Sequence, residues 1–343
     1  MRAYVVRRLM FLVLVLFGVS VLIFGILMTF SPERRAAAYI TTPQQARDIP
    51  RLVRQYGLDQ PFYVQYVRWV REIARGNLGW SLVAARPVGE AFWRYFPVTL
   101  ELNLFASPLI ILLGIWLGTQ AGIHQDTWLD HGTRIFAIVG WSLPTFLFAL
   151  VLLMVFYGYF QLFSPGVLSD AISLVIADGP RAFVRYTGMY TVDGLLNGRL
   201  DVTLDALGHL VLPVLTQVIV IVALLMRVMR SGMLNELSKD YVVTAWAKGT
   251  DPKTVYFKHV RRNALLPVVT VAGQLVALGM EGSISVEVVF NRQGIGWWLA
   301  ESATQLDMPV LMCICLFMGL VFVATNLIVD LFYAHIDPRV CLT

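Results

Sequence analysis

The sequence predicts an all-α polytopic membrane protein with six transmembrane helices and two external segments. Of its 343 residues, 57% are hydrophobic and 14% are charged, whereas soluble domains carry about 25% charged residues. The mean hydropathy is +0.68. Six apolar stretches each reach the roughly 20 residues that a helix needs to cross a bilayer: 9–30, 102–123, 135–163, 207–226, 264–290 and 308–329.

The first stretch, 9–30, follows a basic amino terminus, so a cleaved signal peptide is the alternative to a transmembrane helix. Its uncharged run is longer than a signal-peptide core, and Ser31-Pro32-Glu33 is a poor cleavage context. We therefore expect residues 1–30 to form the first transmembrane helix.

Residues 31–96 are expected to form the first external segment. Within it, Pro61–Arg75 has apolar and aromatic residues at helical spacing, with arginines on another face. This pattern favours a helix at the membrane interface, or one packed on an external domain. The second external segment, 164–206, is rich in Gly and Asp and has room for short helices.

The remaining five helices form a predicted membrane core over residues 97–334, followed by a tail, 335–343. The stretch 135–163 is interrupted by Pro144, and the stretch 264–290 is uncharged only as far as Met280. Gly114, Gly118 and Gly122 repeat at every fourth residue, which indicates close helix packing.

Charge distribution sets the expected orientation. Residues 226–265 hold eight Lys and Arg against three acids, which favours a cytoplasmic position. Residues 31–97 hold ten Arg against five acids, which conflicts with an external position, but loops this long often escape the rule. We expect both termini in the cytoplasm of a cell inner or plasma membrane. The net charge of +5 then reflects topology, and no nucleic acid partner is expected.

Between the fourth and fifth stretches lies a basic helix–Gly–helix segment, Asp240–Pro267. Tyr241–Lys248 has helical spacing, and Gly249 suits the left-handed residue that ends a helix. Asp251 and Pro252 suit the cap and first position of a second helix. Such a loop between membrane spans is suited to be held by a cytoplasmic partner.

The sequence contains none of the motifs of common catalytic sites. No phosphate-binding G-x-x-x-x-G-K-[ST] loop occurs, and the motifs G-x-S-x-G and H-E-x-x-H are absent as well. The five histidines are scattered. We expect no catalytic residue, no metal site and no cofactor bound by this chain.

Ionisable residues at membrane spans are costly and therefore functional candidates. For most of them, Glu101 included, snorkelling or an ion pair at a span end is a sufficient explanation. Glu281 and Glu287 are the deepest, and either could line a polar path or pair with Arg227 on the preceding helix. We take these three residues as possible pore or gate positions.

Several stretches, in order, resemble the permeases of binding-protein-dependent ABC importers, in the dipeptide, oligopeptide and nickel branch. The resemblance covers nearly the whole chain. It rests on YGLDQPFYVQYVRWV (56–70), RGNLGWSL (75–82), PVTLEL (97–102), DYVVTAWAKG (240–249), HVRRNALLPVV (259–269), VEVVFNRQGIGWWLAESATQLDMPV (286–310) and NLIVDLFYAHIDPRV (326–340).

The resemblance implies a type I ABC importer permease fold and a coupling helix, roughly Gly249–Arg262, held in a groove of a cytoplasmic ATPase. The implied coupling residues are Val243, Thr244, Ala245, Gly249, Asp251, Pro252, Lys253, Val255, Tyr256 and Phe257. Val255, with Tyr256 or Phe257, is expected to supply most of the docking energy. The basic residues either pair with the ATPase or hold the loop at the anionic leaflet. One departure is that Val243-Thr244-Ala245 stands where the family signature has Glu-Ala-Ala.

The implied assembly pairs this chain with a second, similar permease around a pore, as a heterodimer in the membrane lipids. Two cytoplasmic ABC ATPases, which hold ATP and Mg, and an external or periplasmic solute-binding protein complete it. The expected cargo is a short peptide; nickel, glutathione or an oligosaccharide are the alternatives within the family. A secondary transporter is the rival function, and an intramembrane enzyme or scaffold is disfavoured by the missing motifs.

Overall fold

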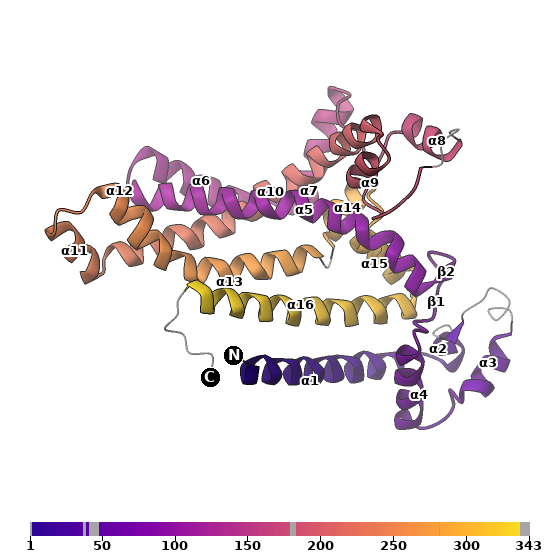
Figure 1. Cartoon of the computed structure of the whole chain (residues 1–343). Coiled ribbons are helices and arrows are strands. Elements are labelled where there is room, and N and C mark those ends of the chain that lie inside the picture. Colours follow the sequence, from indigo (N-terminus) through magenta and orange to yellow (C-terminus); the bar gives the residue numbers. More distant parts are fainter. Residues whose placement is uncertain (1, 37–38, 41–47, 179–182, 281, 337–343) are drawn as a thin grey trace.

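The computed structural model describes residues 2–36, 39–40, 48–178, 183–280 and 282–336. Its long helices run side by side (Figure 1). Five helical segments are long and apolar enough to cross a membrane. They are α1 (Arg2–Leu27), α5 (Val88–Ile123), α10 (Leu200–Leu237), the continuous segment Pro252–Met280, and α16 (Met308–Ile336).

The remaining predicted span, 135–163, corresponds to a sharply bent pair of helices. Helix α6 (Trp128–Ser142) is followed by α7 (Thr145–Leu152) and the wider turns of η3 (Leu153–Tyr159), and the two halves differ in direction by 99°. Leu143 has extended backbone, with φ −77° and ψ 121°, as expected for a residue that precedes proline. The count of six helices therefore holds if this broken pair is one span.

Several predicted boundaries are corrected. Helix α5 begins at Val88, so the border placed between residues 96 and 97 falls inside a helix. The stretch 264–290 does not form one helix. Helix α13 (Arg261–Met280) ends within it, and Gly282 turns the chain with a φ of +93°. Glu281 and residues 337–343 of the predicted tail lie outside the described residues.

Short elements gather at one end of the bundle (Figure 1). The first external segment contains the predicted helix as α4 (Phe62–Ala74), preceded by α2 (Pro32–Ala36) and α3 (Ile49–Tyr56). A small antiparallel pair, β1 (Trp80–Ser81) and β2 (Arg86–Pro87), leads into α5. The second external segment contains α8 (Asp170–Asp178) and α9 (Tyr190–Leu196), and α14 (Ile284–Val289) and α15 (Ile295–Thr304) precede α16.

The core forms where α5 packs along α10, and the predicted glycine repeat lies at this contact. A Cβ added to Gly114, Gly118 or Gly122 would lie 2.9 Å or less from the Cβ of Leu225, Met229 or Met233, respectively. Only glycine permits this approach of the two backbones. The packing interpretation of the repeat is confirmed.

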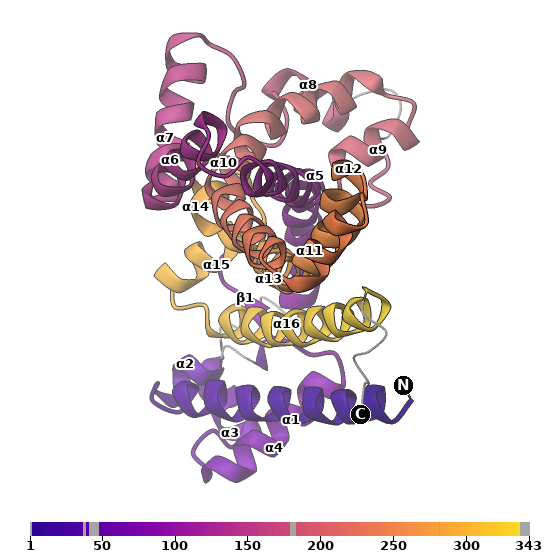
Figure 2. The same ribbon diagram turned by 90° about the vertical axis from the view of Figure 1, so that its left-hand side faces the viewer.

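Helix α1 is set apart from α5, α10 and α13, with α16 between it and them (Figure 2). It is held at its carboxyl end by α4, which crosses it. The Phe24 ring lies 5.5 Å from Phe62, 5.5 Å from Tyr66 and 5.2 Å from Trp69, between ring centroids. This aromatic cluster fixes the first external segment to the membrane helices.

Candidate functional site

The helix–Gly–helix segment lies at the end of the bundle opposite the short external elements (Figure 1). Its first helix is α11 (Asp240–Ala247). Gly249 has a φ of +71°, its N–H donates to Trp246 O, and the N–H of Thr250 donates to Ala245 O. These two bonds form a Schellman motif, so the predicted left-handed glycine is confirmed.

The second helix begins as predicted, with Asp251 as cap and Pro252 at its first turn. The Asp251 carboxylate accepts from the N–H of Thr254 at 3.3 Å. The chain then continues without a break through α12 (Pro252–Thr254) and η4 (Val255–Val260) into α13. The residues of the expected helix Gly249–Arg262 are therefore helical from Pro252 onward, and they form the first turns of the long segment Pro252–Met280. Only α11 is a free-standing short helix in this loop.

One side of the loop packs into the core. Val242 of α11 is 2% exposed, and Val255 and Val260 are fully buried among residues of α10 and α13. The expectation that Val255 forms an apolar docking face is therefore wrong. Its side chain faces the interior, because α12 leans on the bundle.

The opposite side exposes a different set of apolar residues. Val243 is 63% exposed, Trp246 40%, Phe257 38% and Tyr241 37%. We call these four residues the exposed apolar face. The Trp246 ring meets Tyr256 edge-on at 5.8 Å, and Lys248 and Lys253 are exposed around it. Of the other predicted coupling residues, Thr244 is exposed with its hydroxyl donating to Asp240 O, and Ala245 packs on the core.

Polar contacts tie α11 to its neighbours. The Tyr241 hydroxyl donates to Glu236 Oε2 at 2.8 Å and accepts from Asn263 Nδ2 at 3.2 Å. Desolvation raises the pKa of the Tyr241 phenol, so the hydroxyl keeps its proton. Helix α11 is thereby linked to the ends of both α10 and α13, and a force applied to it reaches two long helices.

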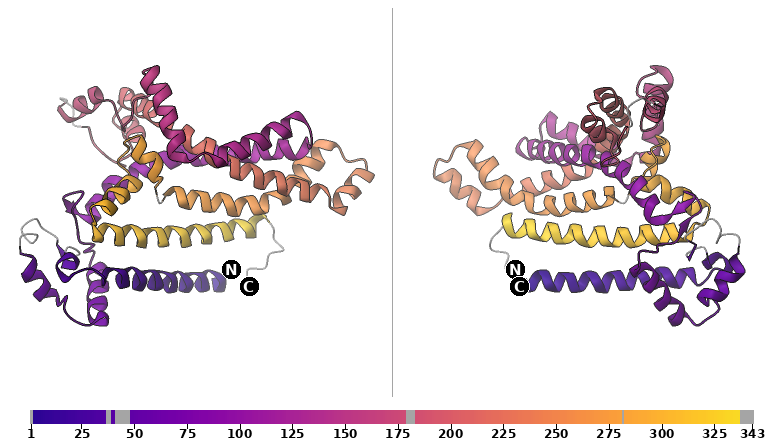
Figure 3. Two further views of the ribbon diagram at one scale, coloured as in Figure 1. Left: turned by 180° about the vertical axis from the view of Figure 1, so that it is seen from behind. Right: turned by 45° about the vertical axis from the view of Figure 1, so that its right-hand side comes forward.

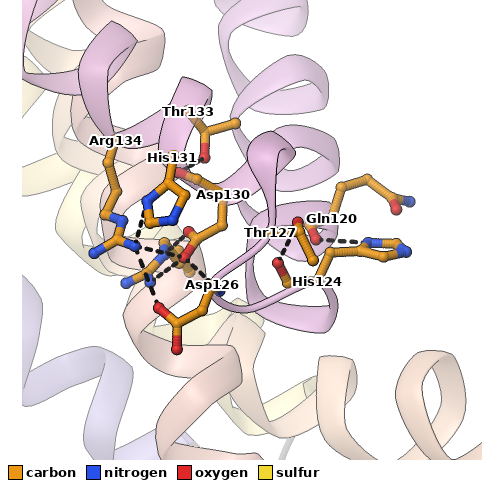
Figure 4. A network of polar contacts seen from close by, with 9 residues as sticks. Gln120, His124, Asp126, Thr127, Asp130, His131, Thr133 and Arg134 are labelled. Carbon is orange, nitrogen blue, oxygen red and sulfur yellow. Dashed lines mark hydrogen bonds and ion pairs between the residues drawn. The ribbon is translucent and has the colours of Figure 1, made fainter.

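A buried ion pair joins α6 to α10 near the same end of the bundle (Figure 4). Asp130 is fully buried and accepts from Arg230 Nε at 2.5 Å and Arg230 Nη2 at 2.8 Å. Arg134 lies 3.2 Å from the same carboxylate. The backbone N–H of Asp126 completes its coordination at 3.1 Å. The pair holds the turn after α5 to the segment of α10 that leads into α11.

Of the predicted pore or gate residues, Glu287 and Arg227 do not come together. Glu287 is fully buried and accepts from Thr99 Oγ1 at 2.8 Å and from the N–H of Trp297 at 3.0 Å. Arg227 lies with its guanidinium 5.8 Å from the Trp141 ring centroid. Glu287 therefore does not pair with Arg227, which was one of the two alternatives for it, and contacts Thr99 and Trp297 instead. Glu281 lies outside the described residues.

At that external end, a buried junction connects α5, α9 and the segment around α14. Glu101 accepts from Arg292 Nη2 at 3.1 Å and from both the N–H and hydroxyl of Thr191 at 2.8 Å. Glu101 and Arg292 are each 1% exposed at the side chain. Of the two explanations that the sequence left open for Glu101, the structure shows the ion pair.

Sequence reasoning missed Arg292 and the Asp130–Arg230 pair. Asp130 and Arg230 are 100 positions apart, and no local pattern relates them. Buried charges of this kind require partners. The sequence signal that could have indicated a pair was Asp130, an acidic residue close to the start of a membrane span. Within the described residues, no group of three or more His, Cys, Asp or Glu is arranged to hold a metal ion.

Comparison with known proteins agrees with this architecture. Residues 110–341 match the family model described as binding-protein-dependent transport system inner membrane component, and residues 1–103 match that of its amino-terminal part. The chain is 34% identical to a dipeptide transport system permease protein, DppB, of Alkalihalophilus pseudofirmus, with 99% of each chain covered.

Two further relatives are similar over nearly their whole length. A probable D,D-dipeptide transport system permease protein, DdpB, of Escherichia coli is 39% identical over 96% of this chain and 94% of its own. The oligopeptide transport system permease protein AppB of Bacillus subtilis is 32% identical, with 99% of each chain covered. The chain is therefore a multi-pass membrane protein with the type I ABC permease fold, and it belongs to the family of inner membrane components of binding-protein-dependent transport systems.

Proposed function

We propose that this chain is the permease subunit of an ATP-driven importer and translocates short peptides. The peptide cargo is supported by relatives named for dipeptide and oligopeptide transport. The observation that carries the coupling role is the exposed apolar face, three of whose four residues lie on α11. Helix α11 is itself tied to both α10 and α13. A face of this kind on a rigid lever is suited to receive a push from a motor subunit.

The assembly we propose has two ATPases on the α11 side, which hold ATP and Mg, and a second permease beside this one. A solute-binding protein delivers cargo at the opposite end. The amino end of α1 and the carboxyl end of α16 lie on the same side as α11 (Figure 3), and we assign that side to the cytoplasm.

The translocation path we propose runs along a cavity of about 460 Å³ between α5, α10 and α13. Polar side chains of Asn103, Ser107 and Gln217 line it among apolar ones, and it reaches the break at Gly279–Ser283. Asn103 Nδ2 donates to Gly279 O at 2.6 Å, beside that break. A partner permease facing this cavity would complete a pore of mixed character, as uncharged peptide backbone requires.

Reconstitution tests the proposal. Liposomes that contain both permeases and the ATPases should accumulate labelled dipeptide only with internal ATP and external binding protein. Uptake without the ATPases would favour a secondary transporter. Uptake of nickel, glutathione or an oligosaccharide in place of dipeptide would correct the cargo and leave the machine intact.

Orientation needs a separate test. In a cysteine-free background, Lys248→Cys should react with an impermeant maleimide only after the cytoplasmic face is opened. Asp59→Cys, on the external segment, should react in intact cells. The reverse pattern would overturn the assignment.

A further inference from the structure

We infer that a cleft between α6 and α10 binds the headgroup of an anionic phospholipid, with one acyl chain on its apolar floor. The cleft has a volume of about 250 Å³ and carries three arginines, Arg134, Arg227 and Arg230, beside apolar Ala137, Ile138 and Met226. Basic pockets between transmembrane helices on the cytoplasmic side suit acidic headgroups. Neither the coupling role nor the translocation path uses this cleft.

Charge in the cleft is incompletely balanced. Asp130 is shared by Arg230 and Arg134, and the exposed Asp126 lies 3.3 Å from Arg134. Arg227 is exposed, and among the described residues it forms no ion pair; its guanidinium lies over the Trp141 ring. The Nε of Arg134 is buried without a hydrogen-bond partner in the described structure. A phosphate in the cleft would supply an acceptor for the exposed Arg227.

The level of the cleft fits a headgroup. Arg134 directly precedes the uncharged stretch 135–163, and Arg227 directly follows the uncharged stretch 207–226. Both helices therefore pass from polar to hydrocarbon surroundings at this height. Ile135 and Ile138 are 63% and 68% exposed on α6, and they continue the apolar floor toward the hydrocarbon. This geometry commits the site to a lipid, because a free phosphate compound would leave that floor uncovered.

The purified transport complex tests this inference. After delipidation in detergent, native mass spectrometry counts bound phosphatidylglycerol and phosphatidylethanolamine. The intact complex should prefer phosphatidylglycerol. Arg227→Gln should weaken its binding about fivefold, the effect of one basic residue at an anionic surface. Arg227→Lys should retain binding, and Lys248→Gln, an equal loss of charge on the same side, should leave it unchanged.

Four outcomes would overturn the inference. One is equal binding of the two lipids, and another is unchanged phosphatidylglycerol binding in Arg227→Gln. The third is displacement of the lipid by millimolar glycerol phosphate, which would mean that the acyl chain contributes nothing. Efficient crosslinking of Ile138→Cys to the second permease would show that a protein covers the cleft instead. The assignment to the inner leaflet rests on the proposed orientation, but the lipid count does not depend on transport or on maleimide labelling, so the two proposals fail separately.

Discussion

Replacing Trp246 by alanine should weaken the association of the permease with its ATPase without unfolding it. A fully covered tryptophan buries roughly 150–250 Å², and Trp246 is 40% exposed. Covering that part removes roughly 60–100 Å² from water. At about 25 cal/mol per Å², this contributes about 1.5–2.5 kcal/mol, which corresponds to a 10- to 70-fold weaker complex.

The measurement is a titration of the ATPase against the permease pair in nanodiscs, read by surface-based binding kinetics. Trp128→Ala is the matched control, because Trp128 is 92% exposed and lies at the start of α6, outside the loop. The loss should appear mainly in the dissociation rate. An unchanged affinity for Trp246→Ala, or an equal loss in both variants, would refute the exposed apolar face as the docking surface.

Three further changes test the loop and the core. Gly249→Val should destabilise the loop by on the order of 1–3 kcal/mol, because a β-branched residue does not readily adopt the φ of +71° at this position. This variant should lower ATP-driven uptake, whereas Gly249→Asn, which tolerates this backbone, should keep most of the uptake. Val255→Asp should abolish stable membrane expression, since it buries an unpaired charge. Val243→Asp should express normally and release the ATPase. Normal expression of Val255→Asp would contradict the burial of Val255. Gly118→Ala should destabilise the protein by about 1–3 kcal/mol through overpacking against Met229, which lowers the thermal midpoint. Gly132→Ala, with no atom within 4 Å of its added Cβ, should leave the midpoint unchanged, and equal midpoints of the two variants would argue against the α5–α10 contact.

The membrane spans were predictable because they depend on local composition. A bilayer demands long uncharged runs. Five of the six runs map onto a long helix or onto the bent pair of α6 and α7, and the run 264–290 maps onto α13 only as far as Met280. Caps were equally predictable, since Gly249 and Asp251 act through their own backbone and side chain within a few residues. Pro144 signalled an interruption, but the bend of 99° depends on how both halves pack.

The orientation of single side chains was not predictable from the loop. Val243 and Val255 are both apolar residues in short helices, yet one is 63% exposed and the other fully buried. Val255 is buried because α12, η4 and α13 form one continuous helix that packs on the core. The sequence pattern placed the start of that membrane helix at residue 264. Likewise, Glu287 meets Thr99 across 188 positions, and hydropathy carries no information on such a pairing.

The arrangement of buried charges explains how motion at the loop could reach the opposite end. Helix α10 is continuous from Leu200 to Leu237 and carries a fixed contact at each end. Near α11, Arg230 binds Asp130 of α6. At the external end, Thr203 donates to Thr191 O at 3.2 Å, and Thr191 donates to Glu101. Because breaking a buried ion pair is strongly destabilising, we expect a push on α11 to move α10 with α6 and α9 attached, so that the two ends of the path change together.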